Sequence, residues 1–124
     1  MKRIIPDEIY RGLPCSVVAT GCAMGITERD ALESLKSDSL HSDGYLSLRG
    51  METLLKANVS VLRKVYYKRN ERMCLRDFAH ANTGKKAVIC LLGHFIYFDG
   101  KDYHSFFFNG DDPVVQVWYL SDVA

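Results

Sequence analysis

The stretch AVICLLGHFIYFDG, residues 87–100, decides the fold that the sequence predicts. Two runs of apolar and aromatic residues flank Gly93, and the second run ends at Asp99-Gly100, a favoured pair for a tight hairpin turn. Similar runs follow at Tyr103–Phe108 and Val114–Leu120. Short runs of this kind, separated by turn residues, predict β-strands, so we expect the C-terminal part of the chain to form an antiparallel meander.

The residues before Val59 follow a helical period instead. Each expected helix has a start signal, either a proline in its first turn or a serine or threonine cap. Residues 59–67 then predict a strand, and a short helix is expected around Phe78. Helices first and a sheet second indicate one α+β domain over residues 1–124, with N-terminal helices packed on a C-terminal antiparallel β-sheet. The three expected N-terminal helices run from Pro14 to Gly25, from Thr27 to about Lys36 and from Ser47 to about Asn58, with a polar loop over 37–44.

Composition and charge exclude several classes of protein. Of 124 residues, 48% are hydrophobic and 25% charged, as in a globular domain rather than a disordered or fibrous chain. No apolar run approaches the roughly 20 residues that span a bilayer, so we expect no membrane partner. The 16 basic and 15 acidic residues leave a net charge of +1, which predicts no nucleic-acid partner. The N-terminus lacks the apolar segment of a secretion signal, so a cytoplasmic protein is expected.

The four cysteines are expected to be free thiols. They form no Cys-x-x-Cys pair, and they are too few to stabilise a chain of this length by disulfides; they are Cys15, Cys22, Cys74 and Cys90. No histidine stands at metal-ligand spacing from another ligand. We therefore expect no metal and no cofactor, and most of the thiols are expected to be small core residues.

Cys15 is the candidate nucleophile because it opens the first expected helix. A thiol at that position feels the positive end of the helix dipole, which lowers its pKa. The free backbone N–H groups of the first turn can also stabilise an oxyanion. The alternative is that Cys15 is one more small core residue, and its position alone does not separate the two hypotheses.

His94 is the candidate general base. It follows Gly93 at the start of an expected strand, among apolar neighbours. A histidine in such a place is more often structural, but a cysteine hydrolase needs a thiol and an imidazole brought together from distant segments. Cys15 on an N-terminal helix and His94 on a C-terminal sheet meet that requirement.

Two longer segments resemble a known family. They are PCSVVATGCAMGITERDALESL at residues 14–35 and CLRDFAHANTGKKAVICLLGHFIYFDGKDYHSFF at residues 74–107. In this order they resemble the papain-like cysteine peptidases, especially the small C39-like branch of bacteria and phages. The resemblance implies a papain-like fold with Cys15 as nucleophile and His94 as general base. The residue that matches the family's third member, an aspartate, is His104.

The sequence departs from the family pattern around these residues. Ile9 stands where papain-like enzymes carry the glutamine whose side-chain amide donates to the oxyanion, and Pro14 stands where C39-like sequences often have aspartate. The imidazole of His104 offers no carboxylate. A three-residue hairpin turn would place His104 opposite Ile96, on the sheet face of His94, whereas a two-residue turn would place it on the other face. The remaining candidate supporting or oxyanion-binding side chains are Arg11, Ser105 and Asn109.

The basic residues around Tyr66 and Tyr67 form a second candidate surface. Such a segment is compatible with an acidic peptide or an RNA, although an exposed basic loop is usually only solvated.

The resemblance implies a thiol hydrolase that cleaves a peptide or isopeptide bond through an acyl-enzyme on Cys15. Its substrate would be a peptide or a protein. A second hypothesis is a catalytically weak or inactive papain-like fold used as a protein-binding module, for example a phage or mobile-element protein acting on a host protein. A third is a small interaction domain in which Cys15 and His94 are incidental. The missing glutamine and carboxylate favour the second hypothesis, and the retained Cys-His pair favours the first.

Overall fold

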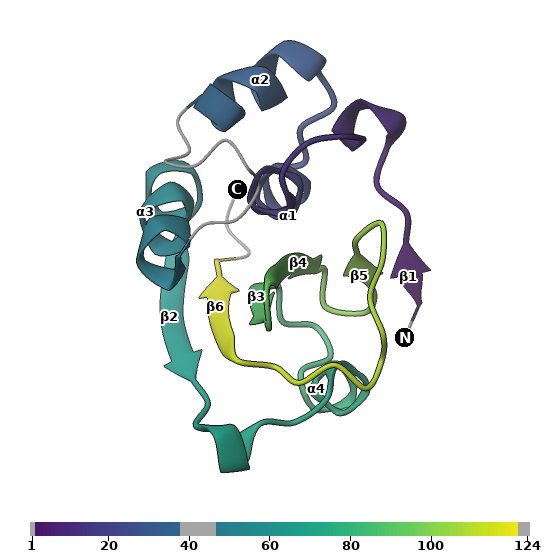
Figure 1. The fold of residues 1–124 in the computed structure, drawn as a ribbon, viewed down its shortest axis with the longest axis vertical. Helices are drawn as coiled ribbons and strands as arrows, with labels where there is room; N and C mark the ends of the chain where they lie inside the picture. The colour runs from purple at the N-terminus through teal and green to yellow at the C-terminus, as the bar shows by residue number, and fades with distance from the viewer. Residues whose placement is uncertain (1, 38–46, 122–124) are drawn as a thin grey trace.

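The computed structural model describes residues 2–37 and 47–121, so most of the expected loop over 37–44 lies outside the described residues. Helices precede a six-stranded sheet, which confirms the α+β class (Figure 1). The helical elements are η1 (Glu8–Tyr10), α1 (Cys15–Met24), α2 (Arg29–Ser37), α3 (Leu48–Asn58), η2 (Arg69–Glu71) and α4 (Leu75–Ala81). The strands are β1 (Arg3–Ile4), β2 (Val61–Tyr66), β3 (Ala87–Leu91), β4 (His94–Phe98), β5 (Tyr103–His104) and β6 (Gln116–Leu120).

The order of strands differs from the expected meander. The sheet runs β1-β5-β4-β3-β6-β2, and all neighbours are antiparallel except β1 and β5. The last strand therefore lies beside β3 and not beside β5. The expected strand over Tyr103–Phe108 is reduced to β5, because the chain then turns towards α4, where Leu75 N–H donates to the Asp112 carbonyl. This connection carries the chain past the end of the hairpin to the other side of β3.

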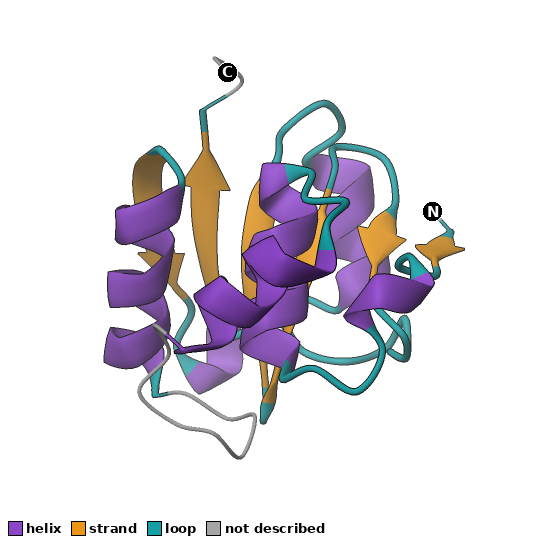
Figure 2. Ribbon diagram, turned by 90° about the horizontal axis from the view of Figure 1, so that it is seen from above, coloured by secondary structure: helices purple, strands orange, loops and turns teal. Residues whose placement is uncertain are grey.

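Both faces of the sheet are covered by helices, which explains the continuous apolar run in β3. Val88 and Cys90 belong to the core beneath α1, α2 and α3, whereas Ala87, Ile89 and Leu91 belong to the core beneath α4. Figure 2 shows the strands between helices on both sides. A strand buried on two faces shows no polar alternation in its sequence. No helix among residues 2–37 and 47–121 is both long and apolar enough to cross a membrane.

Helix α1 is the central helix of the larger core. It begins at Cys15, directly after Pro14, and ends at Gly25 in the left-handed conformation with φ 70°. It packs against β4 and also contacts α2 and α3. Its buried residues lie on every side, which a helix surrounded by other elements requires. Its position fixes where the Cys15 side chain lies relative to the start of β4.

Neighbouring side chains approach α1 closely at Gly21. A Cβ at this position would lie 2.7 Å from both Leu32 Cδ2 and Tyr10 Cε1. We predict that Gly21→Ala lowers the free energy of unfolding, because overpacking costs about 1–3 kcal/mol and exceeds the roughly 1 kcal/mol gained in helix propensity. Urea denaturation measures the change. Met24→Ala, at an exposed position of the same helix, serves as the control and should change stability by less than about 0.5 kcal/mol. A stabilised Gly21→Ala variant would contradict the packing.

Candidate active site

Cys15 and His94 line one cavity. α1 brings the thiol to the cavity, and the two-residue turn between β3 and β4 brings the imidazole. In that turn Gly93 has φ 74°, a conformation that other residues rarely adopt. The cavity has a volume of about 360 Å³ and is largely apolar. Its walls are Leu13, Pro14, Cys15, Val18, Gly93, His94, Phe95, Ser105, Phe106 and Phe107.

Burial determines the protonation state of the Cys15 thiol. It raises the pKa of Cys15 above its usual value, while the backbone N–H groups of Phe95, Ser16 and Cys15 act in the opposite direction. The expectation that the helix N-terminus lowers this pKa is therefore wrong, because desolvation of the thiolate outweighs the nearby amides. The thiol is protonated at neutral pH. The same three amides form a cluster of donors next to the sulfur, in the place where an oxyanion hole is needed.

The imidazole of His94 is held by Ser105. Their atoms Nε2 and Oγ lie 3.0 Å apart, and the Ser105 hydroxyl donates its proton to the Phe107 carbonyl at 2.8 Å. Nε2–H of His94 is therefore the donor to Ser105. In this tautomer of the neutral ring, Nδ1 carries the lone pair. Ser105, expected only as a supporting residue, thus makes the contact that orients the His94 ring.

Phe107 covers the imidazole. The two rings are stacked, with centroids 4.6 Å apart and planes 13° apart. The outer side of Phe107 is exposed, at 64% of its surface. Burial lowers the pKa of His94 below 6.5, and the Phe107 carbonyl and the Asp112 carboxylate act in the opposite direction. The imidazole is accordingly neutral at pH 7 and able to accept a proton.

Asp112 is the carboxylate that acts on His94. Both residues line a second, smaller cavity of about 250 Å³, next to Phe107 and Pro113. Asp112 Oδ2 accepts the backbone N–H of Asn109 at 3.0 Å, which ties the carboxylate into a turn rather than to the imidazole. Its influence on His94 is therefore electrostatic. The loop that carries Asp112 is held in this place by backbone hydrogen bonds to the start of α4, where Leu75 N–H donates to the Asp112 carbonyl.

His104 does not occupy the third position of a triad. The hairpin pairs Phe98 with Tyr103 and Tyr97 with His104, so the turn has four residues rather than two or three. Asp99 Oδ1 accepts the N–H groups of both Lys101 and Asp102, which stabilises the longer turn. Nε2–H of His104 donates to Asp99 Oδ2 at 2.7 Å. The expectation that His104 orients His94 is wrong, because the register moves Ser105 into that role.

Arg11 and Asn109 lie near the site without reaching the thiol. The Arg11 guanidinium carbon is 4.6 Å from the centroid of the Phe106 ring, at the rim of the cavity, and Nε pairs with Glu8. Asn109 Oδ1 accepts the Asp111 N–H and stabilises its own turn. Neither side chain is among the residues that line the Cys15 cavity.

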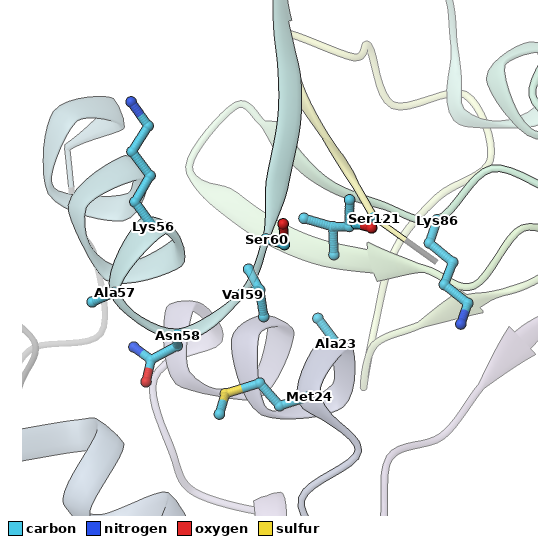
Figure 3. A pocket seen from close by; sticks show the side chains of 10 residues that line it. Ala23, Met24, Lys56, Ala57, Asn58, Val59, Ser60, Lys86 and Ser121 are labelled. Atoms are coloured by element: carbon cyan, nitrogen blue, oxygen red, sulfur yellow. The ribbon is translucent and has the colours of Figure 1, made fainter. Parts of the chain in front are cut away.

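A larger cavity lies elsewhere, at the C-terminal end of α3 (Figure 3). Its volume is about 730 Å³, but among the described residues no thiol, imidazole or carboxylate lines it. The Lys56 and Lys86 side chains extend away from each other in Figure 3, so they do not converge on a ligand. Within the described part of the chain, no group of three or more metal-ligating side chains could hold a metal ion. The Cys15 cavity is therefore the candidate active site.

Comparison with models of known protein families finds no match, and comparisons with curated proteins and with solved structures find none.

The electrostatics of His94 can be tested directly. We predict that an NMR titration of the His94 ring gives a pKa below 6.5 and that Asp112→Asn lowers it further. The sign follows because the carboxylate favours the imidazolium, so its removal favours the neutral ring.

Asp111→Asn is the matched control, because Asp111 pairs with Arg76 Nη1 at 2.9 Å. That variant makes the same charge change one residue away and should leave the His94 pKa nearly unchanged. Equal shifts in the two variants would contradict a specific action of Asp112.

Proposed function

We propose that this protein is a small thiol hydrolase that cleaves a peptide or isopeptide bond with Cys15 as nucleophile and His94 as general base. The observation that carries the proposal is that both residues, from distant segments, line one largely apolar cavity. A hydrolase needs its thiol and imidazole in a common site from which bulk water is excluded. The resemblance to papain-like cysteine peptidases, on residues 14–35 and 74–107, points to the same chemistry.

The mechanism follows from the protonation states. Burial favours a neutral thiol and a neutral imidazole, so no ion pair is formed in advance. His94 Nδ1 would take the proton from Sγ as Sγ attacks the carbonyl carbon. The same proton would pass to the leaving amine as the C–N bond breaks. Water would then hydrolyse the thioester, with its proton taken by His94 and returned to the thiol.

Groups near Cys15 and near His94 would stabilise the charges that develop in the transition state. The amides of Cys15, Ser16 and Phe95 offer donors for the oxyanion, in place of the absent glutamine side chain. Asp112 and the Phe107 carbonyl favour the imidazolium that forms during attack. Ser105 holds the ring but carries no charge. We therefore expect a slower enzyme than one with a carboxylate bonded to its histidine.

A catalytically inactive binding module is the second candidate. It is favoured by the raised pKa of Cys15, because burial leaves little thiolate at neutral pH. In that case the apolar cavity would hold a side chain of a host protein, without covalent chemistry.

Acylation by p-nitrophenyl acetate separates the two candidates without knowledge of the natural substrate. We predict that Cys15 is acetylated with release of p-nitrophenol, and that His94→Ala slows this by about 10²- to 10⁴-fold. Mass spectrometry of peptides identifies the modified residue. Burial raises the pKa values of Cys22 and Cys90 to about 12, so these thiols should react far more slowly.

The experiment is best done in a Cys74→Ser background, since Cys74 is the N-cap residue of α4 and serine is favoured at that position. Acetylation at the same rate in the His94→Ala variant would reject the hydrolase and favour the binding module.

The role of Ser105 gives a further prediction. Ser105→Ala should slow acetylation of Cys15 by about tenfold or more, because the imidazole loses the acceptor that fixes its orientation. Ser105→Thr keeps the hydroxyl and should restore most of the rate. His104→Ala, one residue away, should change the rate by less than about twofold, since His104 is bonded to Asp99. A larger loss in His104→Ala than in Ser105→Ala would contradict the assignment.

A further inference from the structure

The edge strand β2 is a surface that the proposed hydrolase does not use. β2 is the last strand in the sheet order and pairs with β6. In Figure 1 it forms the outer side of the sheet, remote from β5 and β1. Within the described part of the chain, no other strand covers its outer edge. An open edge of this kind can accept an added strand.

The register shows which backbone groups of β2 face outwards. Tyr67 N–H donates to the Val115 carbonyl, and Val65 and Arg63 pair with Val117 and Tyr119 of β6. In an antiparallel ladder, alternate residues bond to the same neighbour. The N–H and carbonyl groups of Lys64 and Tyr66 consequently point away from β6.

Side chains along this edge are both apolar and exposed. Leu62 is 66% exposed and Tyr66 55% exposed. Edges that are only protected against aggregation carry charges, bulges or prolines rather than large apolar groups. β2 has a register shift between Val61 and Arg63, which is one such protection against aggregation. This shift does not explain why the large side chains of Leu62 and Tyr66 are exposed.

Positive charge is concentrated at the same edge. Residues 63–72 contain five basic residues and one acidic residue, a net charge of +4, whereas the whole chain has +1. Lys64 is paired with Glu52 at 2.9 Å, and Arg72 donates to the Tyr67 carbonyl and contacts the Tyr66 hydroxyl. Lys68 and Arg69 are exposed and have no ion-pair partner among the described residues.

We propose that β2 binds an extended acidic segment of a partner protein by strand addition. The backbone of the segment would bond to Lys64 and Tyr66, its carboxylates would meet Lys68 and Arg69, and its apolar side chains would contact Leu62. A second copy of β2 is disfavoured, because two edges of net charge +4 repel each other. RNA is disfavoured because the edge offers N–H and carbonyl groups in alternation, which the backbone of an extended peptide complements and a chain of phosphates does not.

The test uses a fluorescein-labelled octapeptide of alternating glutamate and valine, with binding to the full chain followed by fluorescence anisotropy. Two further peptides carry N-methyl groups, on the glutamates in one and on the valines in the other. Only alternate N–H groups of an added strand face its neighbour. We expect one methylated peptide to bind at least about tenfold more weakly than the other, although both have the same charge.

The role of charge is tested by the double variant Lys68→Glu with Arg69→Glu. This variant should weaken binding of the unmethylated peptide by about tenfold or more. The matched control, Lys85→Glu with Lys101→Glu, makes the same charge change away from β2 and should have an effect of less than about twofold. Three results would overturn the proposal: equal binding of the two methylated peptides, no binding of the unmethylated peptide at millimolar concentration, or tighter binding of an octameric RNA at the same residues.

Discussion

The packing of α1 against β4 is the contact on which the rest of the structure depends. α1 is buried on most of its surface, and Val17 and Ala19 are fully buried in the core that it shares with Phe95. Gly21 allows Tyr10 and Leu32 to approach the helix closely. Because the helix begins at Cys15 and the strand begins at His94, the same packing that forms the core also brings the two chemical groups to one cavity.

Burial of that cavity has opposite effects on its two titratable groups. It raises the pKa of Cys15 and lowers that of His94. Both groups are therefore neutral, and they form no thiolate–imidazolium ion pair. The groups that favour charge act on different members of the pair, the backbone amides on Cys15 and the carboxylate of Asp112 on His94. In the proposed hydrolase, proton transfer would therefore accompany the attack of the sulfur.

The two edges of the sheet differ in length. The edge strand β1 pairs with β5 only through Arg3 and Ile4, whereas β2 runs from Val61 to Tyr66. The β2 edge remains open, with its cations and apolar side chains exposed. Strand order, rather than composition, produces this division: β6 enters between β3 and β2, and it thereby separates the open edge from the Cys15 cavity.

The sequence by itself determined the local elements and the two central candidates. Pro14 and Gly25 bound a helix that opens at Cys15, and the apolar run at 87–91 is a strand buried on both faces, because these signals depend only on neighbouring residues. Tertiary structure decided the rest. Asp99 accepts two backbone N–H groups and stabilises a four-residue hairpin turn, whose even length places Ser105, not His104, on the sheet face of His94. The return of Asp112 towards His94 depends on hydrogen bonds to α4, and the desolvation of Cys15 depends on Phe106 and other side chains far away in the chain. Neither long-range pairing nor desolvation is encoded in local spacing.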